Sequence, residues 1–273
     1  MIPIFAKSRA EAWIKSALAI QENGGRVHNL IIEVLDPGLV TDACRTITKE
    51  VDGFLRHYDC QPVHTVAETI FPSAEYRRGG ISAVLEYPNR IYPLIKSVRA
   101  NQWGTYALRL TERTCSDGTT FKPLEHLLEK MKKELSTTGP KRAAYELDLM
   151  SEPLDLKLFD ADADRDKTRG GQCLSHISFK FGPKRELYIT AIYRYQWFVQ
   201  KALGNLLGLA RLQDCIATEL GVPVGPLVCH ATLAAWESKN LDNSIKWSTK
   251  DLSVWLASLT KLCPQLIIED MPA

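Results

Sequence analysis

The sequence lacks a long apolar run and any strong excess of charge. No stretch approaches the roughly 18 consecutive apolar residues that span a bilayer, so we expect no membrane partner. Basic residues exceed acidic ones only slightly, with a formal net charge of +2. This balance gives no global attraction to nucleic acid or to an anionic membrane. Any anionic ligand therefore has to be held by a local cluster of cations.

Paired cysteines are missing as well. The seven cysteines are scattered singly, with no Cys-x-x-Cys pair. This pattern argues against a disulfide framework and against a zinc or other metal site. The opening segment MIPIFAKSRAEAWIKSALAI has the pattern of a strand and an amphipathic helix rather than that of a secretory signal. We therefore expect a cytoplasmic protein with no metal.

No Pro/Gly/Ser-rich linker and no internal repeat divides the chain. Strand and helix patterns are interspersed, which predicts one mixed α/β domain over residues 1–273. Apolar periodicity and capping residues predict helices at 41–58, 123–140, 203–222 and 248–263, and strands at 27–38, 142–150 and on both sides of a turn at 182–186. Residues 59–93 give no clear prediction.

The stretch GGQCLSHISFKFGPKRELYITAIYRYQW places Cys173 between a glycine pair and a predicted strand hairpin that ends at Arg194. A thiol attacks only as the thiolate, so a nucleophilic cysteine needs positive charge or hydrogen-bond donors nearby. A hairpin brings its two ends together, and a guanidinium there could bind phosphate and lower the pKa of the thiol. Taken alone, however, a cysteine beside a strand is more often a packed small hydrophobe.

Longer pieces of the pattern resemble the thymidylate synthase superfamily, which includes the pyrimidine nucleotide hydroxymethylases. QCLSHISF resembles the archaeal-type nucleophile segment, and this places the nucleophile at Cys173. RYQWFVQKALGN resembles the segment with the phosphate arginine, Arg194, and Asn205 follows eleven residues later as in the family. KEVDGFL resembles the helix with the catalytic glutamate, Glu50, and WGTYALRL the tyrosine segment, Tyr106.

The resemblance extends over about Val27 to Glu237 and implies a fold, a partner and a cofactor. The fold would be a thymidylate synthase-like α+β domain, in which a mixed sheet packs against helices and uses one face for dimerisation. GPKRAA resembles a segment whose two cations reach the phosphate of the partner subunit, and Lys141 and Arg142 hold those places. A homodimer with shared active sites and the donor 5,10-methylenetetrahydrofolate would follow.

The implied reaction is methylation or hydroxymethylation at C5 of a pyrimidine nucleoside monophosphate. Addition of a thiolate at C6, assigned to Cys173, makes C5 nucleophilic. Asn205 would hold the ring amide, because an Asn side chain offers both a donor and an acceptor. Glu50 would move protons through water, with Tyr106 beside it as a catalytic residue. Arg194, Arg142 and Lys141 would neutralise the phosphate, and Gln196 would contribute to substrate binding.

The chain departs from the family at three places. Where the family has Arg-Ser-x-Asp, the chain has Arg194-Tyr195-Gln196-Trp197. Trp197 thus replaces the carboxylate that binds the pterin of the folate. Ala235 and Glu237 stand where a histidine and a tyrosine contact the sugar, and Gly171-Gln172 replaces two prolines before the nucleophile. These changes put ordinary folate and sugar recognition in doubt and predict a looser nucleophile loop.

Several alternatives stay open. The chain could be a catalytically silent relative that binds a nucleotide or acts as a scaffold. A Cys173–His176 hydrolase is disfavoured, because residues three apart on a strand face opposite sides. Asn205 could be a helix N-cap, Glu50 a solvated charge, the 141–142 pair a loop tip and Tyr106 a half-buried strand aromatic. Uracil or cytosine, ribose or deoxyribose, and methyl or hydroxymethyl product also stay undecided, although Asn205 fits uracil best by analogy.

Overall fold

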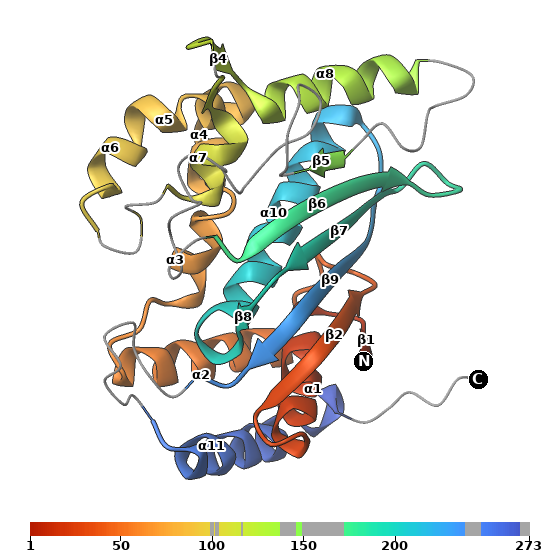
Figure 1. Cartoon of the computed structure of the whole chain (residues 1–273). Helices are drawn as coiled ribbons and strands as arrows, with labels where there is room; N and C mark the ends of the chain where they lie inside the picture. Colours follow the sequence, from red (N-terminus) through yellow and green to blue (C-terminus); the bar gives the residue numbers. More distant parts are fainter. Residues whose placement is uncertain are drawn as a thin grey trace. The chain divides into compact units, whose positions relative to one another are not determined.

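The structure is a computed structural model, which describes residues 1–98, 101, 104–115, 117–136, 146–148, 172–237 and 247–267 (Figure 1). The chain divides into two compact units. Unit 1 combines Met1–Val66, Tyr193–Leu207 and Pro226–Ala273, and unit 2 combines Ala67–Ile192 and Gly208–Gly225. Each unit is described by itself. The single domain expected over 1–273 stays a prediction.

Unit 1 contains strands of both orientations. Strand β1 (Ile2–Ala6) runs parallel to β2 (Arg26–Val34), with Ile2 opposite Leu30. Strand β2 is antiparallel to β9 (Val224–Ala235), and the short β8 (Gln196–Trp197) runs parallel to β9. The expected mixed sheet packed against helices is therefore confirmed.

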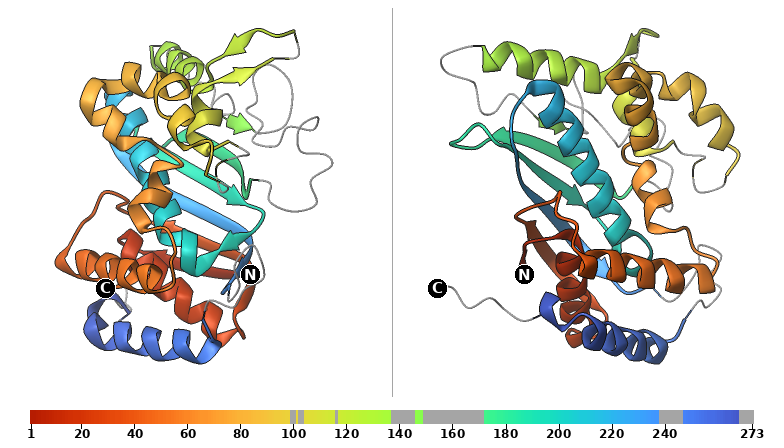
Figure 2. Two further views of the ribbon diagram at one scale, coloured as in Figure 1. Left: turned by 90° about the vertical axis from the view of Figure 1, so that its left-hand side faces the viewer. Right: turned by 180° about the vertical axis from the view of Figure 1, so that it is seen from behind.

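Helices cover the strands of unit 1. Helix α1 (Arg9–Glu22) packs against β1 and β2, and α2 (Asp42–His57) and α11 (Thr249–Leu262) pack against α1 (Figure 1, Figure 2). Each of the three begins at a hydroxyl N-cap that accepts a backbone N–H, namely Ser8, Thr41 and Ser248. The 3₁₀ helix η4 (Pro264–Leu266) follows α11 and also contacts α1.

An aromatic cluster joins these helices. The ring of Phe54 in α2 stacks on Trp255 in α11 with centroids 4.0 Å apart, and Trp13 in α1 meets Trp255 edge-on at 5.7 Å. Trp13 also stacks on Phe198 at 6.1 Å. Because Trp13 and Phe198 are fully buried, this cluster forms the centre of the core of unit 1.

Unit 2 combines short helices with an antiparallel hairpin. Its helices are α4 (Ser73–Leu85), α5 (Tyr87–Arg90), α6 (Tyr92–Ile95), α7 (Tyr106–Thr111) and α8 (Pro123–Leu135), together with most of α10 (Leu203–Leu220). Helix α3 (Val63–Glu68) begins in unit 1 and ends in unit 2. Strands β3 (Arg113–Thr114) and β4 (Thr120–Phe121) form a small hairpin.

The larger hairpin of unit 2 joins β6 (Leu174–Phe181) to β7 (Leu187–Tyr193), and β5 (Glu146–Asp148) pairs with β6. The predicted turn at 182–186 is confirmed: Gly182 N–H donates to the Glu186 carbonyl at 2.9 Å, and Arg185 adopts a positive φ of 62°. Nearby, the Gln213 amide donates to the buried carbonyls of Leu187 and Gly225 at 2.7 and 2.8 Å. This bond pair ties α10 to the hairpin.

The helices predicted at 41–58, 123–140, 203–222 and 248–263 are present within one to a few residues of their expected ends in the described chain. The strand predicted at 142–150 is described only as β5. The alternative interpretation of Tyr106 as a strand aromatic is wrong, because Tyr106 begins helix α7 after the N-cap Thr105. The unassigned region 59–93 folds mainly as the short helices α3 to α6.

Candidate functional site

The segment around Cys173 is held against the start of α7, and all of these residues belong to unit 2. The backbone N–H groups of Cys173 and Leu174 both donate to the phenolic oxygen of Tyr106, each at 3.0 Å. The side-chain amide of Gln172 donates to the carbonyl of Gly104 at 2.6 Å. The structure therefore brings together Cys173 and Tyr106, two of the residues predicted to be catalytic.

The Tyr106 ring is half-buried as a whole, but its hydroxyl group is buried. Desolvation raises the pKa of the phenol above its usual range, and the negative charge of a Cys173 thiolate adds to this effect. The N–H groups of Leu174 and Cys173 oppose it. Tyr106 therefore stays neutral at physiological pH and keeps a proton that it can donate while its oxygen accepts two bonds.

The Tyr106 end of this contact is itself anchored. The Thr105 hydroxyl caps α7 by accepting Leu108 N–H at 3.1 Å, and it lies 3.0 Å from the buried hydroxyl of Tyr87. Ala107 N–H donates to the Thr69 carbonyl at 2.9 Å. These bonds fix the first turn of α7 and with it the phenol.

The hairpin joins the two ends that the sequence expected to meet. Ser175 Oγ donates to the carbonyl of Ile192 at 3.0 Å, so the start of β6 lies against the end of β7. Arg194 follows Ile192 by two residues along the chain and belongs to unit 1. The closeness of Cys173 and Arg194 stays a prediction.

The predicted phosphate ligand Arg194 is exposed, and its guanidinium forms no ion pair with residues in the described ranges. Its backbone carbonyl accepts the Thr232 hydroxyl at 2.7 Å, which fixes the main chain at this point. The guanidinium of a fixed, exposed residue suits the binding of an anion.

The two residues after Tyr195 form β8. Gln196 is buried, and its amide nitrogen contacts the Cys229 sulfur at 3.9 Å, while its Oε1 accepts no hydrogen bond from the described residues. Trp197 is half-buried and pairs with Ala235 of β9. Trp197 and Ala235, two of the residues that differ from the resembled pattern, are therefore neighbours in space.

Asn205 lies in the first turn of α10 and is only 6% exposed. It is not the N-cap considered above, because the π-helix η3 (Phe198–Ala202) runs directly into α10. Its side chain makes no hydrogen bond within the part of the chain that the structure describes. Buried amides are normally hydrogen-bonded, so this amide has donor and acceptor capacity for a ligand or water.

Glu237, at the position of the family tyrosine, caps η3. Its two carboxyl oxygens accept the N–H of Val199 at 3.2 Å and that of Gln200. Burial raises the pKa of Glu237 to about 8, and the two N–H groups lower it only in part. Here the side chain has a structural role at a helix start, which the sequence did not indicate.

Glu50 lies on α2 in unit 1 and is half-buried. Phe54, one turn along on the same side, stacks on Trp255 of α11. Burial raises the pKa of Cys263 at the end of α11, and the charges of Cys44 and Glu50 add to that shift. Glu50 therefore lies near the C-terminal end of α11, and its catalytic role stays a prediction. Lys141 and Arg142 lie outside the described residues.

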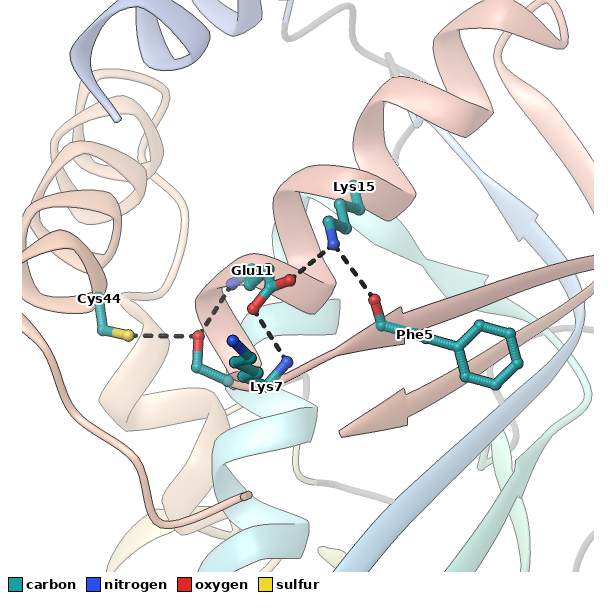
Figure 3. Close-up of polar contacts among 6 residues, drawn as sticks. Phe5, Lys7, Glu11, Lys15 and Cys44 are labelled. Atoms are coloured by element: carbon teal, nitrogen blue, oxygen red, sulfur yellow. Dashed lines mark hydrogen bonds and ion pairs between the residues drawn. The ribbon is translucent and has the colours of Figure 1, made fainter. Parts of the chain in front are cut away.

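Cys44 is a chemically distinctive thiol that the sequence analysis did not single out. It lies in the first turn of α2 and donates to Ser8 Oγ at 3.3 Å (Figure 3). Its sulfur also accepts the Thr41 hydroxyl at 3.2 Å. Burial opposes ionisation, but the Ser8 and Thr41 hydrogen bonds and the charge of Arg9 outweigh it and lower the pKa of Cys44. The Thr41 N-cap three residues earlier was a usable signal.

Within the described ranges, no group of three or more His, Cys, Asp or Glu side chains is arranged to hold a metal ion. None of the described helices combines the length and the apolar character needed to cross a membrane. Comparison with known proteins gives no assignment, because no protein-family model and no curated protein matches the chain.

Proposed function

We propose that the protein activates C5 of a pyrimidine nucleoside monophosphate by covalent addition of Cys173 at C6, and transfers a one-carbon unit to C5. One observation carries this proposal. The backbone N–H of the half-exposed Cys173 donates to the neutral phenol of Tyr106, which fixes the main chain that presents the thiol. A nucleophile needs this combination of access and a fixed backbone. The resemblance to thymidylate synthases supplies the reaction class, and a thymidylate synthase-like fold is part of the proposal.

The proposed reaction consists of addition at C6, exchange at C5 and elimination. The thiolate forms a bond from sulfur to C6, and the π electrons of the C5–C6 bond move to C5 and the C4 substituent. C5 then takes up an electrophile or a solvent proton and loses its original proton to a base. Elimination breaks the bond from sulfur to C6, restores the double bond and releases the thiolate. Solvent alone therefore suffices for exchange at C5.

Substrate binding is assigned to residues of unit 1. Asn205 is buried with an amide available for the ring, and Arg194 is an exposed guanidinium available for the phosphate. The unpartnered Oε1 of Gln196 is a further acceptor. With Lys141 and Arg142 contributed by a partner subunit, the complete site would require a homodimer. Light scattering that shows only a monomer at all concentrations would remove the shared site from the proposal.

Folate fits this chain poorly. Trp197 offers an indole N–H where the pterin needs a carboxylate acceptor, and its backbone is fixed beside Ala235 in the β8–β9 pair. We therefore derive no step through 5,10-methylenetetrahydrofolate. The one-carbon donor of the proposed reaction would have to be recognised in another way.

The test is hydrogen exchange at C5 in D₂O. UMP, dUMP, CMP and dCMP are each incubated with the protein without folate, and the H5 signal is followed by proton NMR. Loss of H5 from at least one nucleotide is expected, and Cys173→Ser should abolish it. Cys115→Ser is the matched control, because Cys115 is an exposed thiol and should be dispensable. No exchange with any of the four nucleotides would contradict the proposal.

The second candidate is a catalytically silent nucleotide-binding or scaffold protein. It is favoured by the position of Glu50 near the end of α11 and by Trp197 beside Ala235. This candidate predicts that one of the four nucleotides raises the melting temperature, while exchange at C5 stays at the level of buffer. Calorimetric titration and the NMR assay on the same preparation separate the two candidates.

A further inference from the structure

The nucleophile segment is tighter than its sequence suggests. Glycine and glutamine replace two prolines before Cys173, which predicted a loosened loop. In the structure, Gln172, Cys173 and Leu174 each donate one hydrogen bond to the short stretch from Gly104 to Tyr106. Three consecutive donors thus fasten the segment at its start.

The acceptor of the Gln172 bond is a rigid point of unit 2. Gly104 is buried and has a φ of +83°, a conformation that other residues adopt only with strain. Thr105, the next residue, is 3% exposed and hydrogen-bonds Tyr87 and Leu108. The carbonyl of Gly104 is therefore held in place independently of the cysteine segment.

We propose that Gln172 is a positioning residue for Cys173. Its side-chain amide supplies the restraint on the residue before the nucleophile that a proline ring supplies by fixing φ. The Gln172 side chain and the Tyr106 phenol together restrain the residues on both sides of the peptide bond between Gln172 and Cys173. We infer that this fixes the direction of the Cα–Cβ bond of Cys173, and with it the position of the thiol. The reaction concerned rests on the proposed function, but the restraint on the thiol does not.

Gln172→Met is the sharpest variant, because methionine keeps the length and volume of the side chain and removes the donor. Gln61→Met is the matched control, since Gln61 is exposed and lies in unit 1. Two rates are measured for each protein. One is alkylation of Cys173 by iodoacetamide, followed by peptide mass spectrometry with the exposed Cys115 as internal reference. The other is C5 exchange.

Without this restraint, the Cys173 thiol becomes more accessible to iodoacetamide but is less well oriented toward C6 of the pyrimidine. We expect alkylation of Cys173 to accelerate about threefold to fivefold, and kcat for exchange to fall about fivefold or more with KM within about twofold, as one hydrogen bond implies. The melting temperature should stay close to that of Gln61→Met. Faster alkylation together with slower exchange marks a positioning role. General unfolding would instead accelerate the alkylation of Cys173 and lower the melting temperature together.

The proposal is overturned if iodoacetamide alkylates Cys173 at the same rate in Gln172→Met and in Gln61→Met. It is also overturned if the faster alkylation in Gln172→Met is accompanied by a lower melting temperature than that of Gln61→Met. If the unmodified protein shows no C5 exchange, the proposed function fails on its own. The alkylation rates still decide whether Gln172 restrains the thiol.

Discussion

Trp197 pairs with Ala235 across the parallel strands β8 and β9. The family resemblance expects a pterin-binding carboxylate at the first position and a sugar-binding histidine at the second. Neither of these polar groups is present at this pair of positions in unit 1, where an indole and a methyl group stand instead. The two departures from the resembled pattern therefore fall at one pair of positions between β8 and β9.

Replacing Asn205 by alanine should impair substrate processing with little effect on folding. No described residue loses a hydrogen bond when this amide is removed, so we expect the melting temperature to change only slightly. Exchange at C5 should fall about 10-fold to 100-fold, because the ring amide would lose two bonds. Proton NMR and thermal melts give the two readouts.

Gln213→Ala is the informative comparison for Asn205→Ala. Its amide donates to two buried carbonyls, of Leu187 and Gly225, and both would lose that hydrogen bond. A destabilisation of about 2 kcal/mol or more is expected from denaturant unfolding. If Asn205→Ala destabilised the protein as much as Gln213→Ala does, the amide would have a structural role.

Arg194→Ala should weaken the binding of nucleotides but not of nucleosides. Removal of a charge-assisted contact to phosphate is expected to raise KM about 10-fold to 100-fold. Nucleosides lack the phosphate, so their already weaker reaction should not change further. Exchange rates for uridine and UMP, or for the corresponding active pair, measure this. Arg26→Ala, also exposed in unit 1, should leave both substrates unaffected, and equal losses for nucleoside and nucleotide would contradict the assignment.

The raised pKa of Glu237 predicts a pH-dependent stability. Between its ordinary value of 4.5 and about 8, the folded protein holds a proton that the unfolded chain has lost. The free energy of unfolding contributed by this group is therefore full below pH 4.5 and falls as the pH rises to about 8. The loss should be on the order of a few kcal/mol in urea titrations.

Glu237→Gln removes the titrating proton and keeps an oxygen that accepts the N–H groups of Val199 and Gln200. Its stability should therefore change less with pH than that of the unmodified protein. Glu22→Gln, at an exposed position, should retain the full dependence. Identical pH profiles for the Glu237 and Glu22 variants would show that Glu237 does not cause the slope.

Gly204→Ala should destabilise the protein, whereas Gly53→Ala should stabilise it. A methyl group at Gly204 would lie 2.5 Å from Val66 Cβ and 2.8 Å from the Val63 carbonyl, which predicts a loss of about 1–3 kcal/mol. Gly53 is an exposed residue of α2 with nothing near the added methyl, and alanine there should add about 0.5–1 kcal/mol. Melting temperatures that shift in the same direction would contradict the close approach of α3 and α10.

Much of the framework could be predicted because its patterns are local. Helices α2, α8 and α11 combine an apolar stripe with an N-cap or an initial proline, and the β6–β7 hairpin shows alternation on both sides of a Gly-Pro turn. In long elements of this kind, the residues that determine the structure lie within the element itself and can be recognised in the sequence. The interspersed order of strands and helices predicted the mixed α/β class, whereas the mixed sheet was implied by the family resemblance.

The errors arise where packing over long sequence distances decides the structure. Gly204 and Asn205 suggested a helix boundary, but the glycine lies inside a continuous helical run and admits α3 at close range. Tyr106 begins a six-residue helix whose cap depends on the buried Tyr87. Gln172 suggested a loose loop, because its partner carbonyl is 68 residues away in the sequence.

The five residues of η3 lie between the arginine segment and Asn205, and their π-helical turn holds one residue more than an α-helical turn would. Deleting a single residue from Phe198–Ala202 would let the turn relax to ordinary α geometry. The short strand β8 before it would then have to rotate by about a quarter of a revolution relative to the start of α10, against its pairing with β9. A linker one residue shorter than the present eleven-residue spacing would therefore change the direction of the Arg194 main chain relative to Asn205.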